Sequence, residues 1–220
     1  MKKLLVIIAL IFSSFSLYAQ GGDNHWGIQA SFDINIPSKI GGRLNGEKLD
    51  LFRMGYGGSV GAVYSHWFND VIFLEPGVSL FYDTYSYRDM IIEDGMTNKS
   101  EIDPSLYKLC VRVPLVVGYS YYLLDSLPMR VYTGPELSYS FAGQIRIKNK
   151  SLISDSDFNT DLFGKNGFMN PFVFDWKIGL GFDTDFATVC VEAAIGISDV
   201  YKDYLKLREN RVSVSVTHYF

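Results

Sequence analysis

Hydrophobic and polar residues alternate along most of the chain, the period-two pattern typical of β-strands that have one apolar and one polar face. Between positions 107 and 119 every odd-numbered residue is apolar or aromatic, whereas the even-numbered ones include Lys108, Arg112 and Gly118. Near the end of the chain, valines at 212, 214 and 216 alternate with serine or threonine. The pattern predicts eight strands, at 26–36, 53–68, 71–88, 105–122, 129–147, 171–182, 187–198 and 210–220.

The connections between these strands alternate between long and short. Polar segments of 11 residues or more occupy 37–52, 89–104, 148–170 and 199–209. Short turns lie between them, at 69–70, 123–128 and 183–186. An antiparallel barrel with both termini in the periplasm has this asymmetry, because its long loops face outside and its short turns face inside. The sequence therefore predicts an all-β protein, an eight-stranded antiparallel up-and-down transmembrane β-barrel.

The polarity of the two strand faces distinguishes a membrane barrel from a soluble one. In the sixth strand Phe172, Phe174 and Trp176 share one face, and Asp175 and Lys177 share the other. Eight strands enclose only enough space for side chains, and a soluble barrel needs that space to be apolar. A polar lumen with lipid outside fits this pattern better than a soluble β-core.

Aromatic residues concentrate near the predicted strand ends, as expected for the two interfaces of a membrane. The expected periplasmic set is Trp67, Phe68, Tyr119, Tyr121, Tyr122, Tyr219 and Phe220. The expected outer set is Tyr82, Tyr85, Tyr87, Tyr107, Phe172 and Phe174.

The first 19 residues have the order of a secretory signal peptide: the basic residues Lys2 and Lys3, an apolar run at 4–12 and a segment rich in small residues that ends at Ala19. We expect cleavage after Ala19, which leaves a barrel domain at 20–220. The apolar run is short for the alternative of a retained membrane anchor. Without Lys2 and Lys3, 18 basic residues stand against 24 acidic ones, a net charge of −6 that argues against binding to nucleic acid. No long apolar run follows, so a membrane location requires a closed barrel.

Several motifs resemble those of the PorT-like outer-membrane β-barrel proteins of the Bacteroidetes. They are RVPLVVGY at 112–119, YTGPELSY at 132–139, DWKIGLG at 175–181, NRVSVSV at 210–216 and THYF at 217–220. The alternating apolar end with Val216, His218 and the terminal Phe220 also resembles the signal that barrel assembly machinery binds during biogenesis, although Thr217 and His218 replace the usual Gly and Lys. The resemblance implies an outer-membrane location with periplasmic termini and extracellular long loops, and for a few members a role in protein secretion.

Charged residues on the inward face are the main candidates for function. We expect Glu75, Arg112 and Glu136 near mid-height on three successive strands, and Lys177 and Glu192 on the sixth and seventh. Buried charges must be paired, so one interpretation is an ion-pair network that plugs the lumen and fixes the register. The other is the lining of a narrow ion path or a gate. The small bore of eight strands favours the plug.

Histidine placement bears on enzymatic function. His25, His66 and His218 are the only histidines, and all map to periplasmic strand ends. A serine nucleophile needs an imidazole within hydrogen-bond reach, and the long outer loops contain none. We therefore predict no catalytic residues and no cofactor, although a carboxylate pair could serve a barrel enzyme.

Two further features have simple explanations. The run DSDFNTD at 155–161 spaces oxygen ligands as a calcium loop does, but Thr160 and Asn166 stand where glycine and glutamate are required, so an acidic loop is expected instead of a metal site. Cys110 and Cys190 face inward at opposite heights, too far apart for a disulfide, and are expected to be free and buried.

Three classes of function follow. The first is a structural or interaction protein, an accessory component of an envelope or protein-secretion assembly. The alternative is a narrow porin-like channel for ions or small solutes, and the third class is a barrel enzyme that uses its outer rim. The expected partners are outer-membrane lipid, the barrel assembly machinery and envelope or secretion proteins. A plugged lumen favours the first class over the channel.

The barrel prediction can be tested by gel electrophoresis in detergent. A closed barrel resists unfolding until it is heated, so an unboiled sample should migrate faster than a boiled one. Equal migration of the two samples would contradict the barrel.

Overall fold

The computed structural model describes residues 24–37, 40–44, 47–49, 53–86, 90–94, 98–123, 127–150, 155–164, 167–202 and 207–220. The predicted signal peptide at 1–19 lies outside this part of the chain. No helix among the described residues is long and apolar enough to cross a membrane.

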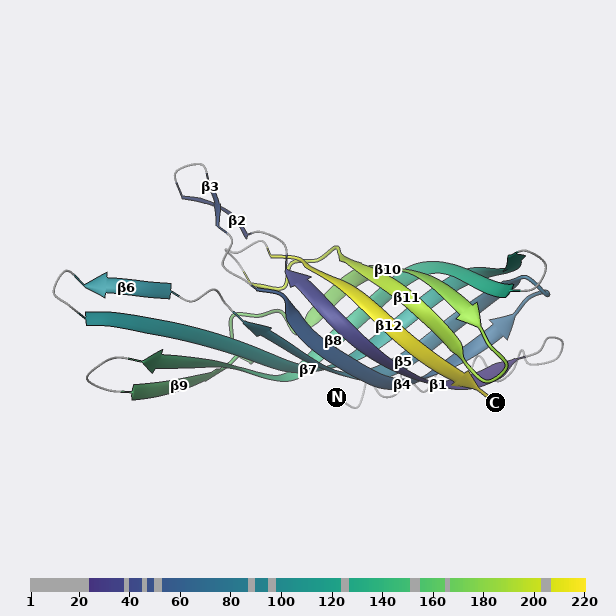
Figure 1. The fold of residues 1–220 in the computed structure, drawn as a ribbon, viewed down its shortest axis with the longest axis horizontal. Coiled ribbons are helices and arrows are strands. Elements are labelled where there is room, and N and C mark those ends of the chain that lie inside the picture. The colour runs from purple at the N-terminus through teal and green to yellow at the C-terminus, as the bar shows by residue number, and fades with distance from the viewer. Residues whose placement is uncertain are drawn as a thin grey trace.

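Eight long strands form a closed barrel (Figure 1). They are β1 (His25–Pro37), β4 (Gly55–Trp67), β5 (Ile72–Ser86), β7 (Asn98–Leu123), β8 (Leu127–Lys150), β10 (Phe172–Asp183), β11 (Thr188–Gly196) and β12 (Glu209–Tyr219). Each pairs antiparallel with the next long strand along the chain, and β1 pairs with β12 from Gly27↔Tyr219 to Pro37↔Glu209 to close the ring. The predicted fold class, an eight-stranded antiparallel up-and-down barrel, is confirmed.

The two ends of the barrel differ. At the end where β1 begins and β12 finishes, which we call the terminal end, short turns connect the strands. At the opposite end, the loop end, the long connections carry four shorter strands: β2 (Ile40–Leu44), β3 (Glu47–Leu49), β6 (Met90–Asp94) and β9 (Asp155–Asp161).

Burial alternates strictly along most barrel strands. In β10, Phe174, Trp176 and Ile178 are exposed on the outer face, and Asp175 and Lys177 are buried in the lumen. Outer positions from Tyr107 to Tyr119 on β7 and from Val212 to Val216 on β12 are likewise aromatic or aliphatic. Side chains at successive strand positions point to opposite faces, so the alternation in the sequence produces an apolar exterior and a polar interior.

The predicted aromatic girdles need a correction. Tyr119, Tyr122 and Phe220 are exposed at the terminal end, and Tyr82, Tyr107 and Phe172 are exposed toward the loop end. Three members of the predicted sets lie on the lumen phase of their strands instead: Trp67 packs against Phe73, Tyr85 is buried, and the Tyr219 hydroxyl donates to Glu75. Strand phase therefore overrides the interfacial preference of these rings. Tyr87 lies outside the described residues.

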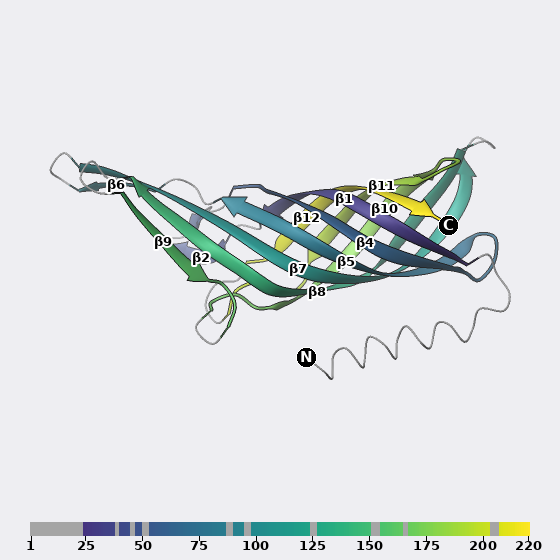
Figure 2. The ribbon, with the colours of Figure 1, turned by 90° about the horizontal axis from the view of Figure 1, so that it is seen from below.

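The connections predicted as loops at 89–104 and 148–170 both contain strand residues. β7 has 26 residues and β8 has 24, and the two stay paired beyond the barrel as far as Glu101↔Lys150. β6 pairs with β7 on one side and β9 pairs with β8 on the other. We call this four-stranded extension the projecting sheet; it stands out from the loop end in Figures 1 and 2. The many charged residues of this segment led to the prediction of a loop. They alternate with apolar residues, however, which is the pattern of an antiparallel sheet with a solvated face.

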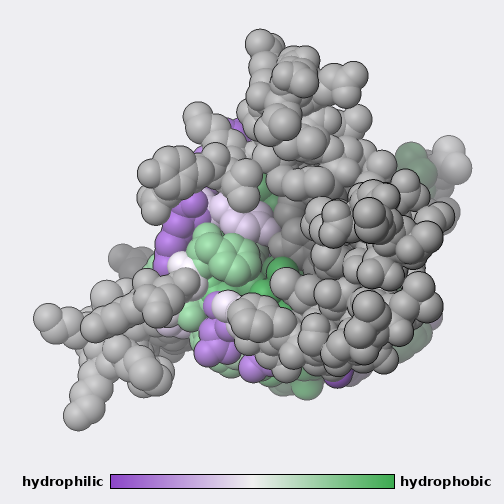
Figure 3. All heavy atoms as spheres, turned by 90° about the vertical axis from the view of Figure 1, so that its left-hand side faces the viewer, coloured by the Kyte–Doolittle hydropathy of each residue, from purple (hydrophilic) through white to green (hydrophobic). Residues whose placement is uncertain are grey.

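Apolar clusters occupy the lumen toward both ends. The mouth cluster, at the loop end, contains Tyr85, Leu106, Leu162, Met169, Val173, Val200, Tyr201 and Leu207. Figure 3 looks onto this end, and green apolar residues lie beside purple polar ones in the part that grey atoms leave visible. Toward the terminal end Phe73, Val116, Tyr132 and Cys190 form a second cluster. Described residues of two connections, Leu162 and Met169 in one and Val200, Tyr201 and Leu207 in the other, thus pack into the mouth.

Glycines on the lumen face make room for the second cluster, which gives a stability prediction. A Cβ at Gly118 would lie 2.2 Å from the Phe73 ring, so Gly118→Val must displace that ring. We expect a loss of about 1–3 kcal/mol from overpacking. A urea titration measures this loss: the mobility of unboiled samples in electrophoresis reports the folded fraction, and the midpoint should fall. Ala193→Val on the exposed face of β11 is the matched control and should leave the midpoint unchanged.

Candidate functional site: the barrel lumen

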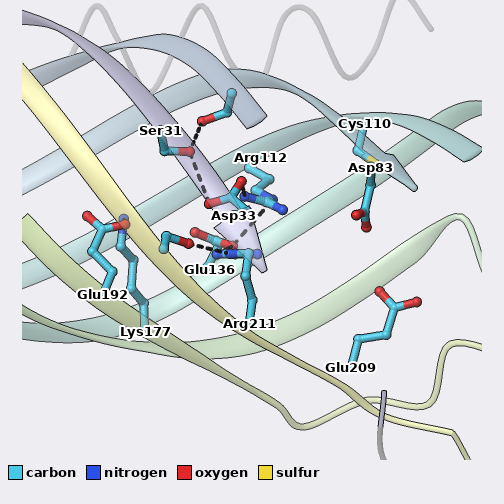
Figure 4. Close-up of polar contacts among 12 residues, drawn as sticks. Ser31, Asp33, Asp83, Cys110, Arg112, Glu136, Lys177, Glu192, Glu209 and Arg211 are labelled. Atoms are coloured by element: carbon cyan, nitrogen blue, oxygen red, sulfur yellow. Dashed lines mark hydrogen bonds and ion pairs between the residues drawn. The ribbon is translucent and has the colours of Figure 1, made fainter. Parts of the chain in front are cut away.

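The central layer of the lumen is built around two arginines on strands far apart in the ring (Figure 4). Arg112 on β7 lies 3.3 Å from Asp33 on β1 and 3.7 Å from Glu136 on β8. Arg211 on β12 donates to Glu136 across 2.6 Å. The Arg112 guanidinium also sits over the Phe81 ring, with 3.0 Å between its carbon and the ring centroid. All four charged side chains are buried, so each carboxylate meets a guanidinium in a site with little water.

The layer toward the loop end centres on Lys108 of β7. Its ammonium forms ion pairs with Asp83, at 3.4 Å, and with Glu209. Asn35 donates to Asp83 from β1. A cavity of about 20 Å³ separates this layer from the central one, and Asp175 lines it with one carboxylate oxygen that has no hydrogen-bond partner. A space of this size holds about one water molecule, which could bond to that oxygen.

The layer toward the terminal end contains separate pairs. Lys177 lies 2.8 Å from Glu192, whose other oxygen accepts from the Tyr132 hydroxyl at 2.6 Å. Glu75 accepts from Tyr219 across 2.7 Å. Arg130 pairs with Asp183 at 2.7 Å. Every layer therefore joins strands that are not neighbours, and the lumen is crossed by polar contacts at three heights.

The five predicted lumen residues are all buried, but they do not form one network. Arg112 and Glu136 meet in the central layer, and Lys177 and Glu192 meet in the terminal layer. Glu75 is not at the height of Arg112, because the register pairs Arg112 with Ser79 and places Glu75 opposite Val116. The prediction of a shared mid-height for Glu75, Arg112 and Glu136 was therefore wrong. Strand tilt and stagger, which position along the sequence does not give, account for the error.

Several lumen charges were missing from the predicted network. They are Asp33, Asp83, Lys108, Arg130, Asp175, Asp183, Glu209 and Arg211. Their positions in the period-two pattern could have identified them as lumen residues, because each stands on the same face as the small and polar residues of its strand. Their partners could not be found in this way, since Arg112 meets Asp33 across the lumen and not on an adjacent strand.

The residues of the predicted assembly signal share the outer face of β12. Val216 and Phe220 are exposed there, and His218 is exposed with its Nδ1 2.5 Å from the Phe186 carbonyl oxygen. The other two histidines also lie at the terminal end: His25 begins β1, and His66 Nδ1 lies 2.7 Å from Asn24. The imidazoles are thus far from the projecting sheet.

The remaining candidates for chemistry are placed as follows. Cys110 and Cys190 are buried and free, as predicted, in different layers. The calcium-like segment Asp155–Asp161 is strand β9, although most of its side chains and residues 165–166 lie outside the described set. Within the part of the chain that the structure describes, no three His, Cys, Asp or Glu residues are grouped to hold a metal ion.

Comparisons with known proteins identify structural neighbours. No family model matches the chain. No curated protein matches it either. One similar solved structure is the attachment invasion locus protein Ail of Yersinia pestis, in complex with the heparin analogue sucrose octasulfate. It is 12% identical to this chain with a TM-score of 0.44, and the match covers 90% of this chain and 99% of Ail. Neisserial surface protein A is 16% identical with a TM-score of 0.42, covering 89% and 97%. The N-terminal β-barrel domain of Pseudomonas aeruginosa OprF is 16% identical with a TM-score of 0.34, covering 91% and 100%.

The chemical capacity of the lumen follows from its contents. Charged side chains from opposite walls are paired, apolar clusters lie above and below them, and the central cavity has room for about one water molecule. Such an interior fixes the strands relative to one another and leaves little space for a solute. The lumen is therefore suited to holding the barrel rigid.

Removing Arg112 tests this structural role. Arg112→Ala leaves Asp33 and Glu136 short of a buried counter-charge, which should destabilise the barrel by about 3–5 kcal/mol. The urea midpoint of the folded band measures the loss. As a control, Arg208→Ala removes an exposed ion pair in which the Arg208 side chain lies 3.8 Å from Asp199. This change should cost at most about 1 kcal/mol. A stable Arg112→Ala barrel with a large new conductance would instead support a gate.

Proposed function

We propose that the chain is an integral outer-membrane β-barrel that acts as an interaction protein, an accessory component of an envelope or protein-secretion assembly. The observation that carries the proposal is the combination of a filled lumen with a sheet that projects from one end. A filled lumen leaves the exposed surfaces as the places where the protein can act. Among the described residues, the projecting sheet is the largest regular structure outside the barrel.

The apolar exterior supports the membrane location. The outer face of β10 runs from Phe172 to Phe182 without a charged residue. Ten residue steps at ~3.3 Å, tilted by ~40°, rise about 25 Å along the barrel axis, the height of the apolar band in outer-membrane barrels. Exposed Tyr119, Tyr122 and Phe220 at one end and Tyr82 and Tyr107 toward the other match the two interfaces. Outer-membrane lipid is the solvent that fits this surface.

The orientation and the family are part of the same proposal. Short turns at the terminal end and long connections at the loop end favour periplasmic termini and an extracellular projecting sheet. The exposed end of β12, with Val216, His218 and Phe220, would then bind the assembly machinery during biogenesis. Membership of the PorT-like proteins of the Bacteroidetes rests on the motifs at 112–119, 132–139 and 175–181.

Site-specific photo-crosslinking in the native outer membrane tests the interaction role. A photoreactive residue at Ser156 of β9 should give a discrete protein adduct. The same residue at Val214, on the lipid-facing side of β12, should give none. Planar-bilayer recordings of the purified protein should show no stable open state, because paired charges and apolar clusters occupy the lumen. Sustained unit conductance without an adduct at position 156 would favour the narrow porin-like channel.

A further inference from the structure

The strand β9 forms a free edge of the projecting sheet. In the order of strands it stands last, and among the described strands it pairs only with β8. The backbone donors and acceptors on its other side therefore have no partner within the sheet. An exposed edge of this kind is a template for the addition of one more strand.

The charges at paired positions of the sheet alternate in sign from strand to strand. Glu101 of β7 stands opposite Lys150 of β8, which stands opposite Asp155 of β9. In the next row of this face Asp103 and Asp157 flank Lys148 in the same way. Opposite charges at directly paired positions stabilise a sheet, and like charges destabilise it. The series is thus acidic, basic and acidic, and it stops at β9.

The two faces of the sheet continue the outer and inner faces of the barrel. Asp161 of β9 pairs with Gln144, which in turn pairs with Tyr107, a residue exposed on the outer face. The acidic positions of β9 therefore belong to the outer face. The alternate positions of β9 carry Ser156, Phe158 and Thr160. A strand that continues this sheet would need basic residues on one face and apolar or β-branched residues on the other.

We propose that β9 binds an extended polypeptide segment with lysine or arginine at every second residue, which adds to the sheet as its next strand. The basic residues would stand opposite Asp155, Asp157 and Asp161. This inference rests on the proposed interaction function and specifies the class of partner. The partner is a basic extended segment of another protein.

A second copy of this chain is a poor occupant of the same edge. Antiparallel pairing of two β9 strands about Phe158 would place Asp155 opposite Asp161 of the other copy, which brings like charges together. The opposite edge, β6, has no alternating charge: Met90, Ile91 and Ile92 precede Glu93 and Asp94. Charge therefore selects both the edge and the partner.

Binding of defined peptides to the full chain in lipid nanodiscs tests the proposal. The probe is a fluorescent nine-residue peptide that alternates lysine with valine or threonine. Its binding is measured by fluorescence anisotropy at low and at physiological salt. The first control replaces every lysine by glutamate, and the second replaces the intervening residues by proline, which keeps the charge but cannot form the backbone ladder. We expect binding of the lysine peptide, weakened by salt, and at least about tenfold weaker binding of both controls.

Matched variants locate the binding at β9. The double variant Asp155→Asn and Asp157→Asn should bind the lysine peptide about fivefold more weakly, the effect of losing two exposed charge pairs. Glu93→Gln with Asp94→Asn removes the same charge from β6 and should leave the affinity unchanged. Faster migration of unboiled samples confirms that each variant is folded.

Three outcomes would overturn the proposal. Equal weakening by the β6 variant would mean that overall charge, and not the β9 edge, attracts the peptide. Tight binding of the proline peptide would rule out strand addition. Absence of lysine-peptide binding, together with a protein adduct at position 156 in the native membrane, would reject the basic segment and leave the interaction function standing. A conducting barrel without an adduct would reject the interaction function itself.

Discussion

Lipid offers no hydrogen-bond partner to a polypeptide backbone, so strands that span a bilayer must pair into a ring without edges. In this protein the ring depends on the pairing of the first and last strands, from Gly27↔Tyr219 to Pro37↔Glu209. Closure by eight strands makes the interior narrow and divides every strand into an outward-facing and a lumen-facing series. The apolar exterior, the polar lumen and the position of each functional candidate follow from that division.

The narrow interior explains why the lumen is both charged and filled. Residues from strands on opposite walls come within hydrogen-bond distance, so Arg112 of β7 reaches Asp33 of β1. A buried charge without a partner costs several kcal/mol, which is why acidic and basic residues occur together in every layer. Large rings occupy the remaining space beside residues without a side chain, as Tyr132 does next to Gly179. Such a lumen joins the walls of the barrel and leaves little room for transport.

Beyond the barrel the constraint changes, because water can satisfy a free backbone edge. Among the barrel strands that the structure describes, only β7 and β8 continue far past the mouth, and they carry β6 and β9 on their outer sides. The projecting sheet has two edges instead of closure, and at outward positions it carries charged residues such as Glu101 and Lys150 where the barrel carries apolar ones. An edge that would be forbidden in lipid becomes a surface on which another chain can add. The transition from closed to open sheet therefore separates the anchor from the proposed interaction surface.

The sequence alone determined the barrel, its strand count and the phase of nearly every strand. A period-two pattern is local, and alternate side chains must face opposite sides whatever the neighbouring strands do. The burial of Glu75, Arg112, Glu136, Lys177 and Glu192 followed from phase in the same way. Only the tertiary structure decided which of these residues meet, because heights depend on the stagger between tilted strands and cross-lumen partners depend on closure. It also decided that 98–104 and 155–161 are strand, since strand formation among charged residues depends on pairing with the opposite charges of β8, which lie far along the chain from 98–104.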